Sequence, residues 1–198
     1  DILITNTCAF IHDARQESLE TLEDLARHKR PDQALIAAGC FPQRDSDTIC
    51  RRVPAVDAVL GTRSWPEIVE LVEALGQRRR GVLRRIHERG DLVASVQRSA
   101  IMGRTAYLKI ADGCDAGCAF CAIPEIKGPQ VSKPQAEILR EAQELVDQGV
   151  QELVLIAQDL ISWAQTLLLD GALARCEPKR LRYRLLHVAG RITRLARS

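Results

Sequence analysis

Aromatic residues are scarce in this chain of 198 residues, at only 4% of the sequence. This argues against an aromatic stacking platform for single-stranded nucleic acid. Long apolar stretches are missing as well, since no segment approaches the roughly 18 apolar residues that a membrane span needs. The first residues, from Asp1 to Thr5, lack the basic and apolar regions of a secretory signal. We therefore expect no membrane association, no export and a cytoplasmic location.

The charges are nearly balanced overall, at +2, but they are spread unevenly. Residues 76–104 carry eight Arg against two acidic residues, and residues 160–198 carry eight Lys or Arg against two acidic residues. Such segments suit contact with RNA or a ribosomal surface. No aromatic or glycine motif of an RNA-binding module accompanies them, so a solvated linker and a solvated tail are the favoured interpretation.

Short apolar runs alternate with helical patterns in the first part of the chain. Residues 2–4, 34–38 and 58–60 are typical of buried strands, and amphipathic segments separate them. This alternation predicts an α/β fold with a parallel sheet and right-handed crossovers. Cys8 and Cys40 each follow a strand, at the edge where open α/β sheets bind ligands. We therefore expect these two cysteines to lie close together.

A second strand–helix–strand unit follows further along the chain. Residues 107–110 and 153–156 are typical of strands, and a helix starting at Pro134 lies between them. The Arg-rich stretch before this unit has weak periodicity, with short strands predicted around residues 82–83 and 92–93. The predicted divisions of the chain are an amino-terminal α/β domain, an Arg-rich linker, the start of a second core and an atypical basic tail: 1–76, 77–104, 105–159 and 160–198.

Seven cysteines in a chain without an export signal favour metal or thiol chemistry over a disulfide framework. Cys114, Cys118 and Cys121 lie at spacings of four and three on a loop with Gly113 and Gly117. Structural zinc usually needs four ligands, and no fourth Cys or His lies nearby. An iron–sulfur cubane held by three cysteines leaves one iron open to a substrate or cofactor. Three cysteines grouped by chance is the less favoured interpretation.

This spacing resembles the CxxxCxxC signature of the radical S-adenosylmethionine enzymes, which also follows a strand. Other stretches between Asp1 and about Asp159 resemble the methylthiotransferases within that group: Ala106–Cys114, Ile123–Pro124 with Lys127–Gly128, Asn6–Cys8 and Gly39–Arg44. The run from Cys8 to Ile11, continuing into Gln16–Ser18, resembles the branch that modifies an aspartate of small-subunit ribosomal protein S-twelve. The resemblance implies that the amino-terminal parallel-sheet domain is followed by the start of a radical S-adenosylmethionine partial barrel.

The resemblance also implies two iron–sulfur clusters. Cys114, Cys118 and Cys121 would hold a 4Fe–4S cluster whose open iron binds S-adenosylmethionine and cleaves it to a 5′-deoxyadenosyl radical. Cys8 and Cys40 would supply two of three ligands to a second cluster, which takes part in sulfur delivery. An electron donor such as flavodoxin or ferredoxin would be a partner, beside the ribosomal protein substrate and a contact with the ribosome.

Phe120, between two of the cysteines, is expected near the adenine of S-adenosylmethionine, with ordinary loop packing as the alternative. The third ligand of the second cluster is expected before Asp1, and Cys50, without a family counterpart, is expected to be a buried thiol. After Asp159 the family pattern stops, so we expect a chain truncated at both ends with a frame-shifted tail. The alternatives are a tRNA adenosine methylthiotransferase and a non-catalytic iron–sulfur-binding or zinc-binding fragment.

Overall fold

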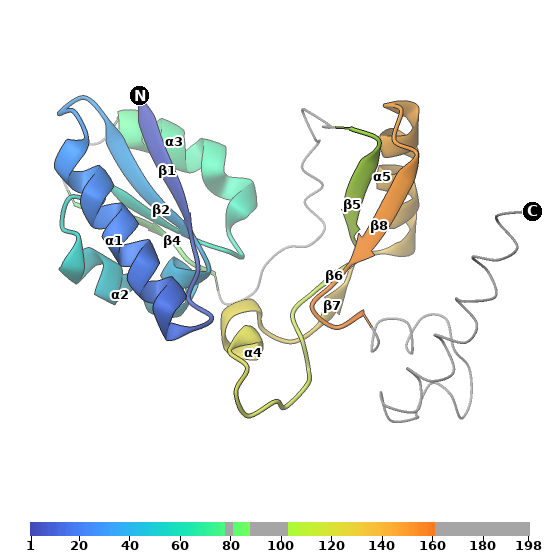
Figure 1. Ribbon diagram of the computed structural model, residues 1–198. Coiled ribbons are helices and arrows are strands. Elements are labelled where there is room, and N and C mark those ends of the chain that lie inside the picture. Colours follow the sequence, from blue (N-terminus) through green and yellow to red (C-terminus); the bar gives the residue numbers. More distant parts are fainter. Residues whose placement is uncertain (78–80, 88–102, 161–198) are drawn as a thin grey trace, which may run out of the picture.

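The computed structural model describes residues 1–77, 81–87 and 103–160 (Figure 1). The predicted strand at residues 92–93 and the tail beyond Leu160 lie outside the described residues. The strands are β1 (Ile2–Thr7), β2 (Ala34–Gly39), β3 (Ala58–Gly61), β4 (Leu83–Arg85), β5 (Thr105–Lys109), β6 (Ala111–Asp112), β7 (Val131–Ser132) and β8 (Glu152–Ile156). The helices are α1 (His12–His28), α2 (Cys40–Arg52), the 3₁₀ turn η1 (Trp65–Glu67), α3 (Ile68–Gly76), α4 (Ile123–Lys127) and α5 (Gln135–Asp147).

Strands β1 to β4 form one parallel sheet in the order β1-β2-β3-β4. Every residue of β3 is buried, and so is every residue of β2 after Ala34. A strand that is covered on both faces has apolar side chains on both. This explains why apolar and polar residues do not alternate in residues 34–38 and 58–60. The parallel α/β fold is therefore confirmed. The short strand expected around residues 82–83 is β4, which extends this amino-terminal sheet.

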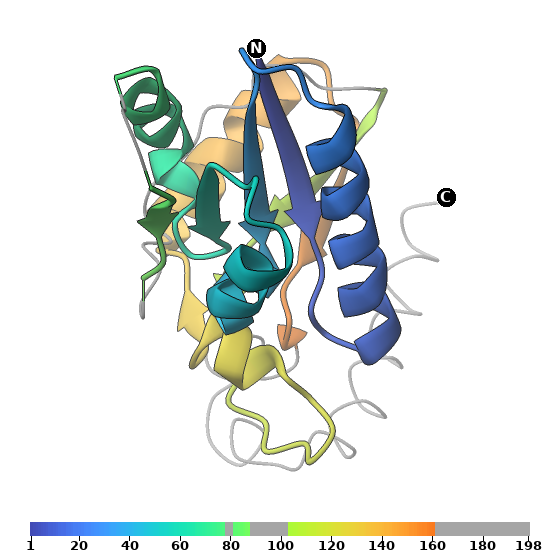
Figure 2. The same ribbon diagram turned by 90° about the vertical axis from the view of Figure 1, so that its left-hand side faces the viewer.

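Helices cover both faces of the amino-terminal sheet. Leu22 of α1 and Ile49 of α2 share one core with Leu35 of β2. On the other face, Leu71 of α3 packs with Leu60 of β3. Figure 2 shows α1 and α2 in front of the sheet and α3 at its far edge. The sheet is thus the middle layer of three.

The crossover from β3 to β4 through α3 differs in hand from the crossovers through α1 and α2. The strand order advances in one direction from β1 to β4, yet α3 lies on the opposite face from α1 and α2. Because of that change of face, the crossover through α3 has the opposite hand to the usual right-handed ones through α1 and α2. This departs from the right-handed crossovers that we predicted. If all three helices lay on one face, the apolar side chains of Ile36, Ala58 and Leu60 on the other face would be exposed to water; α3 buries them.

The second unit is smaller. Strands β5 and β8 pair in parallel, and α5 between them packs Leu145 against Leu108 and Val150. The predicted strand–helix–strand pattern is confirmed here. Strands β6 and β7 form a short antiparallel pair beside it, at the base of the cysteine-rich loop. Among the described residues, no helix has both the length and the apolar character to cross a membrane.

Candidate functional site

Cys8 and Cys40 lie at the carboxyl edge of the amino-terminal sheet. Thr7 and Gly39 are partners in the parallel register, so the residues that follow them leave the sheet at the same edge. The Thr7 hydroxyl donates to the Ala38 carbonyl at 2.7 Å, and the Cys8 amide donates to the Ser18 hydroxyl of α1 at 3.1 Å. These bonds fix the turn that carries Cys8. The position of both cysteines at this edge agrees with the expectation from the strand pattern.

The turn into α2 depends on Gly39. Its φ is 106°, in the region that residues with a side chain rarely adopt. A Cβ at this position would contact the Asn6 side-chain oxygen and lie 2.7 Å from the Thr7 carbonyl oxygen. Helix α2 can therefore begin directly after β2. This abrupt start places Cys40 as the first helical residue, one residue from the end of the strand.

The surroundings of Cys40 come from both parts of the chain. Burial raises the pKa of the Cys40 thiol, and the nearby Cys8 and Asp112 act in the same direction. The Lys127 ammonium and a hydrogen bond with the Thr62 side chain act against them. Cys8 and Thr62 directly follow strands of the amino-terminal sheet, whereas Asp112 and Lys127 flank the loop that contains Cys114, Cys118 and Cys121. The edge of the sheet thus meets the base of that loop.

The cysteine-rich loop is closed at its base. The Cys114 amide donates to the Gly128 carbonyl at 3.1 Å, which joins the two ends of the loop. Gly113 has a φ of 77°, and a Cβ there would run into the Pro129 carbonyl oxygen. Only a glycine therefore allows the two chain segments to approach so closely. We call residues 112–114 and 126–129 the neck of the cysteine loop.

Within the loop, the donor groups suit an iron–sulfur cluster. Cys114 and Cys121 are half-buried and Cys118 is exposed, and all three are free thiols. The Ala116 amide points at the Cys114 sulfur at 3.4 Å, and the Cys121 amide donates to the Cys118 carbonyl at 3.0 Å. Iron–sulfur clusters are held by Cys thiolates, and amide hydrogen bonds to sulfur, such as the one to Cys114, tune their potential.

In the structure, these three thiols are not arranged as a complete metal site. Among the described residues, no three Cys, His, Asp or Glu side chains lie close enough together to hold a metal ion. The type of donor thus fits the predicted cluster, while the assignment of each ligand stays a prediction. This holds for Cys8 and Cys40 as well, which are a pair without a third partner in the part of the chain that the structure describes.

Two further predicted residues have different surroundings. Phe120 is 86% exposed, so packing within the loop does not account for its position, and its place beside an adenine stays a prediction. Cys50 is half-buried in α2 and packs at the border of the core shared by α1 and α2. It is therefore less buried than the buried thiol that we expected.

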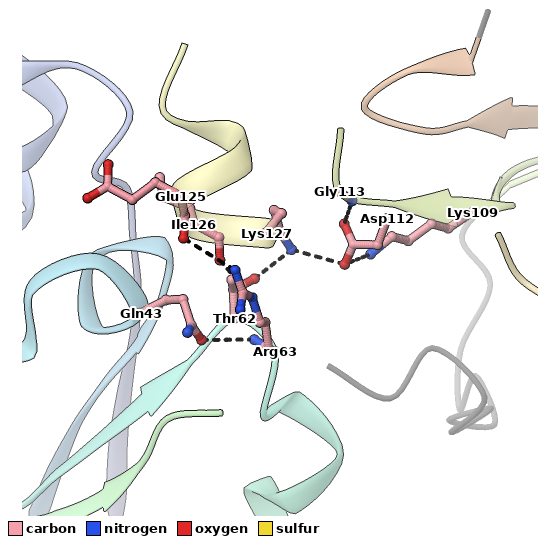
Figure 3. A network of polar contacts seen from close by, with 9 residues as sticks. All are labelled: Gln43, Thr62, Arg63, Lys109, Asp112, Gly113, Glu125, Ile126 and Lys127. Atoms are coloured by element: carbon pink, nitrogen blue, oxygen red, sulfur yellow. Dashed lines mark hydrogen bonds and ion pairs between the residues drawn. The ribbon is translucent and has the colours of Figure 1, made fainter. Parts of the chain in front are cut away.

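A polar network joins the amino-terminal sheet to the neck (Figure 3). Arg63, just after β3, donates from Nε to the Ile126 carbonyl at 3.0 Å and from Nη2 to the Glu125 carbonyl at 3.2 Å. Lys127 donates from Nζ to the Thr62 hydroxyl at 2.7 Å. Thr62 and Arg63 were not among the residues predicted from the sequence. Because they follow a parallel strand, the reasoning that located Cys8 and Cys40 would also have placed them at this edge.

Comparisons with known proteins match both parts of the chain. Residues 1–61 match the family described as "Uncharacterized protein family UPF0004", and residues 108–187 match the Radical SAM superfamily. Three similar relatives are each named "Ribosomal protein uS12 methylthiotransferase RimO". They come from Chloroflexus aurantiacus, Roseiflexus sp. and Symbiobacterium thermophilum and are 43%, 40% and 40% identical.

The alignments with these three relatives include 88% of this chain but only 41%, 41% and 36% of the relatives. The chain thus spans about two fifths of the length of these curated relatives.

Proposed function

Because the chain belongs to the radical S-adenosylmethionine methylthiotransferase family, we propose that it carries the cluster-binding part of an enzyme that adds a methylthio group to an aspartate of ribosomal protein uS12. Both matched segments support this proposal, and so do the names of relatives that are 40–43% identical to this chain. The observation that carries it is the loop of three free thiols closed at a glycine neck. An enzyme with this substrate works in the cytoplasm.

Cys114, Cys118 and Cys121 would bind a 4Fe–4S cluster, and their number leaves one iron for the amino and carboxylate groups of S-adenosylmethionine. When bound, that cluster supplies the one-electron reduction that cleaves the sulfonium. The neck holds the loop at a fixed base, and the 86% exposed Phe120 ring is available to an adenine. An electron donor of the flavodoxin or ferredoxin class would deliver the electron.

Cys8 and Cys40 would contribute to a second cluster, which takes part in sulfur delivery. The pair lies at the carboxyl edge of the sheet, beside the neck, so its position suits transfer toward the first cluster. Two thiols fall short of three cysteine ligands, so a further ligand is needed. The Arg-rich segment, which the structure describes only in part, is the proposed contact with the ribosome.

Anaerobic reconstitution with iron and sulfide tests the ligand assignment. We expect about four irons per chain if only the three-cysteine loop is loaded, and about eight if Cys8 and Cys40 also recruit a cluster. Cys114→Ala should remove about four irons in either case. Cys50→Ala is the matched control, since this thiol packs at the border of the amino-terminal core and should leave the iron content unchanged. Iron content that is the same in wild type and Cys114→Ala contradicts the assignment.

A second assay tests the substrate. The loaded chain is incubated with reductant, a sulfide source and S-adenosylmethionine, together with either uS12 or tRNA. Release of 5′-deoxyadenosine and a mass increase on uS12 support the proposal. A mass increase on tRNA alone favours the adenosine-modifying branch. Metal binding without 5′-deoxyadenosine indicates a non-catalytic binding fragment.

A further inference from the structure

Lys127 is largely buried between two segments of the chain that lie outside its own helix. It is the last residue of α4, six residues after Cys121, and its side chain is only 13% exposed. Its ammonium donates to the Thr62 hydroxyl at 2.7 Å and lies 3.5 Å from a carboxylate oxygen of Asp112. A lysine this buried, with two partners from different segments, differs from the exposed ion pairs that contribute little to structure.

Asp112 connects Lys127 to the start of the cysteine loop. One of its oxygens accepts a hydrogen bond from the Gly113 amide at 3.2 Å, and the other pairs with Lys109 at 2.7 Å and with Lys127. Asp112 precedes the first cysteine by two residues, whereas Lys127 lies at the far end of the loop. The ion pair between them therefore joins the two sides of the neck, beside the hydrogen bond from Cys114 to Gly128.

Thr62 connects Lys127 to the other pair of cysteines. It follows β3 and is 8% exposed, and its side chain lies near enough to the Cys40 thiol to act on the pKa of that group. The chain of contacts thus runs from Asp112 through Lys127 and Thr62 to Cys40. Figure 3 shows Lys127 between Thr62 and Asp112, with its ammonium directed at both. Lys127 thus joins Asp112, two residues before Cys114, to Thr62, which lies near Cys40.

We propose that Lys127 is a positioning residue that fixes the three-cysteine loop against the Cys8 and Cys40 pair by holding Asp112 and Thr62 together. The inference rests on the proposed function for its purpose, because an enzyme with two cluster sites needs a constant separation between them for sulfur delivery. The contact itself is independent of that function. It is made entirely by residues of the chain, without iron or S-adenosylmethionine.

Amide hydrogen exchange measured by NMR on the iron-free chain tests this role. Two reporter amides lie on opposite sides of the bridge: Cys114, which donates to Gly128, and Ser64, which donates to Gly61 at 2.9 Å. In Lys127→Met, both should exchange about tenfold faster, because the segments then open independently. Thr62→Val should give the same result. Lys127→Arg should restore both rates to within about twofold, since it keeps a cationic donor.

Lys133→Met is the matched control. Lys133 is equally buried, at 12% exposure, and pairs with Glu141 inside the second unit, so it does not reach the amino-terminal sheet. It should leave the Ser64 amide unchanged. An unchanged Ser64 rate in Lys127→Met overturns the proposal, as does a rise that Lys127→Arg fails to reverse. Should Lys127→Met not fold, Thr62→Val and Thr62→Ser decide, since only the valine removes the hydroxyl.

Failure of this inference and failure of the proposed function are distinguishable. The exchange rates are measured without iron, so they report the bridge alone. Iron that stays bound in Cys114→Ala contradicts the cluster assignment even if Lys127 holds the segments together. Conversely, full iron loading with unchanged exchange in Lys127→Met removes the positioning role and leaves the cluster assignment intact.

Discussion

The backbone conformation of Gly39 decides where Cys40 lies. With a φ of 106°, this residue turns the chain from β2 into α2 without a connecting loop. The carbonyl of Thr7 and the side chain of Asn6 occupy the space that a Cβ would need. The position of Cys40 beside Cys8 therefore depends on a residue that carries no chemistry itself.

Gly39→Ala should lower the free energy of unfolding by at least about 2 kcal/mol, because it combines left-handed strain with a backbone clash. Urea unfolding followed by circular dichroism measures this change. Gly76→Ala is the control: Gly76 ends α3 and has no atom within 4 Å of an added Cβ. It should leave stability unchanged or raise it by up to about 1 kcal/mol. Equal losses in the two variants would contradict the role of Gly39.

Individual site residues were predictable to different degrees. Cys8 and Cys40 were placed at one sheet edge because parallel strands end together, and the structure has them there. Thr62 obeys the same rule, but its partner Lys127 is 65 positions away. Sequence patterns indicate which residues leave a sheet edge and not which distant loop meets them. The contact around Lys127 therefore emerged only from the structure.

Helix α2 is interrupted at Asp45. Its backbone there is non-helical, with φ −156° and ψ 68°, so two short helices meet at this residue. The Asp45 carboxylate caps the second one, accepting from the Thr48 amide at 3.0 Å and the Thr48 hydroxyl at 2.7 Å. Arg15 of α1 donates to the same carboxylate at 3.2 Å. The kink thus allows α2 to begin at Cys40 and still pack Ile49 into the core.

Burial acts to raise the pKa of Asp45, but the bonds from Thr48 and the nearby Arg15 and Arg51 outweigh it and hold that pKa below its ordinary value of 3.8. The folded state therefore favours the carboxylate. The resulting stabilisation is complete well above pH 3.8 and is lost as the pH falls through the lowered value of the folded state.

Asp45→Ala should cost about 1 kcal/mol near pH 7, and the difference from wild type should shrink as the pH is lowered below 3.8. Urea unfolding at a series of pH values measures it. Asp32→Ala is the control, because it removes a carboxylate that is 67% exposed and should cost less than about 0.5 kcal/mol. A pH-independent difference for Asp45→Ala would show that the charge of the cap does not matter.

The two parts of the chain meet where the amino-terminal sheet contacts α4 and the neck. Besides the Lys127–Thr62 hydrogen bond, two other kinds of interaction cross this boundary. Arg63 donates to two backbone carbonyls at the end of α4, whereas Arg44 pairs with the Glu125 side chain at 3.2 Å. Glu125 is 61% exposed, so water weakens the second interaction. The arrangement of the two parts should therefore depend on Arg63 far more than on Glu125.

Arg63→Met should lower the free energy of unfolding by about 1–2 kcal/mol, because it leaves two carbonyl groups without their charged donor. Glu125→Gln should change it by less than about 0.5 kcal/mol. Both are measured by urea unfolding under the same conditions. Similar losses in the two variants would mean that the exposed ion pair contributes as much as the carbonyl bonds, and would contradict the stronger dependence on Arg63.

The general architecture followed from the sequence because apolar runs and amphipathic segments are local signals. The parallel sheet, the second strand–helix–strand unit and the edge position of Cys8 and Cys40 all rest on them. The face taken by α3 did not follow, since it depends on which side of β3 still needs a cover. The contact between the two parts rests on polar side chains, whose partners no local pattern specifies.

The closed neck also has an entropic consequence. Closing a loop of about 15 residues costs roughly 2 kcal/mol of chain entropy, a cost that a metal centre on an open chain would meet on binding. Here the Cys114–Gly128 hydrogen bond and the Lys127–Asp112 pair close the loop without a metal. The three thiols are therefore held on one closed loop, at a higher effective concentration relative to one another than on an open chain. The first iron to arrive has only to draw together ligands that one closed loop already carries.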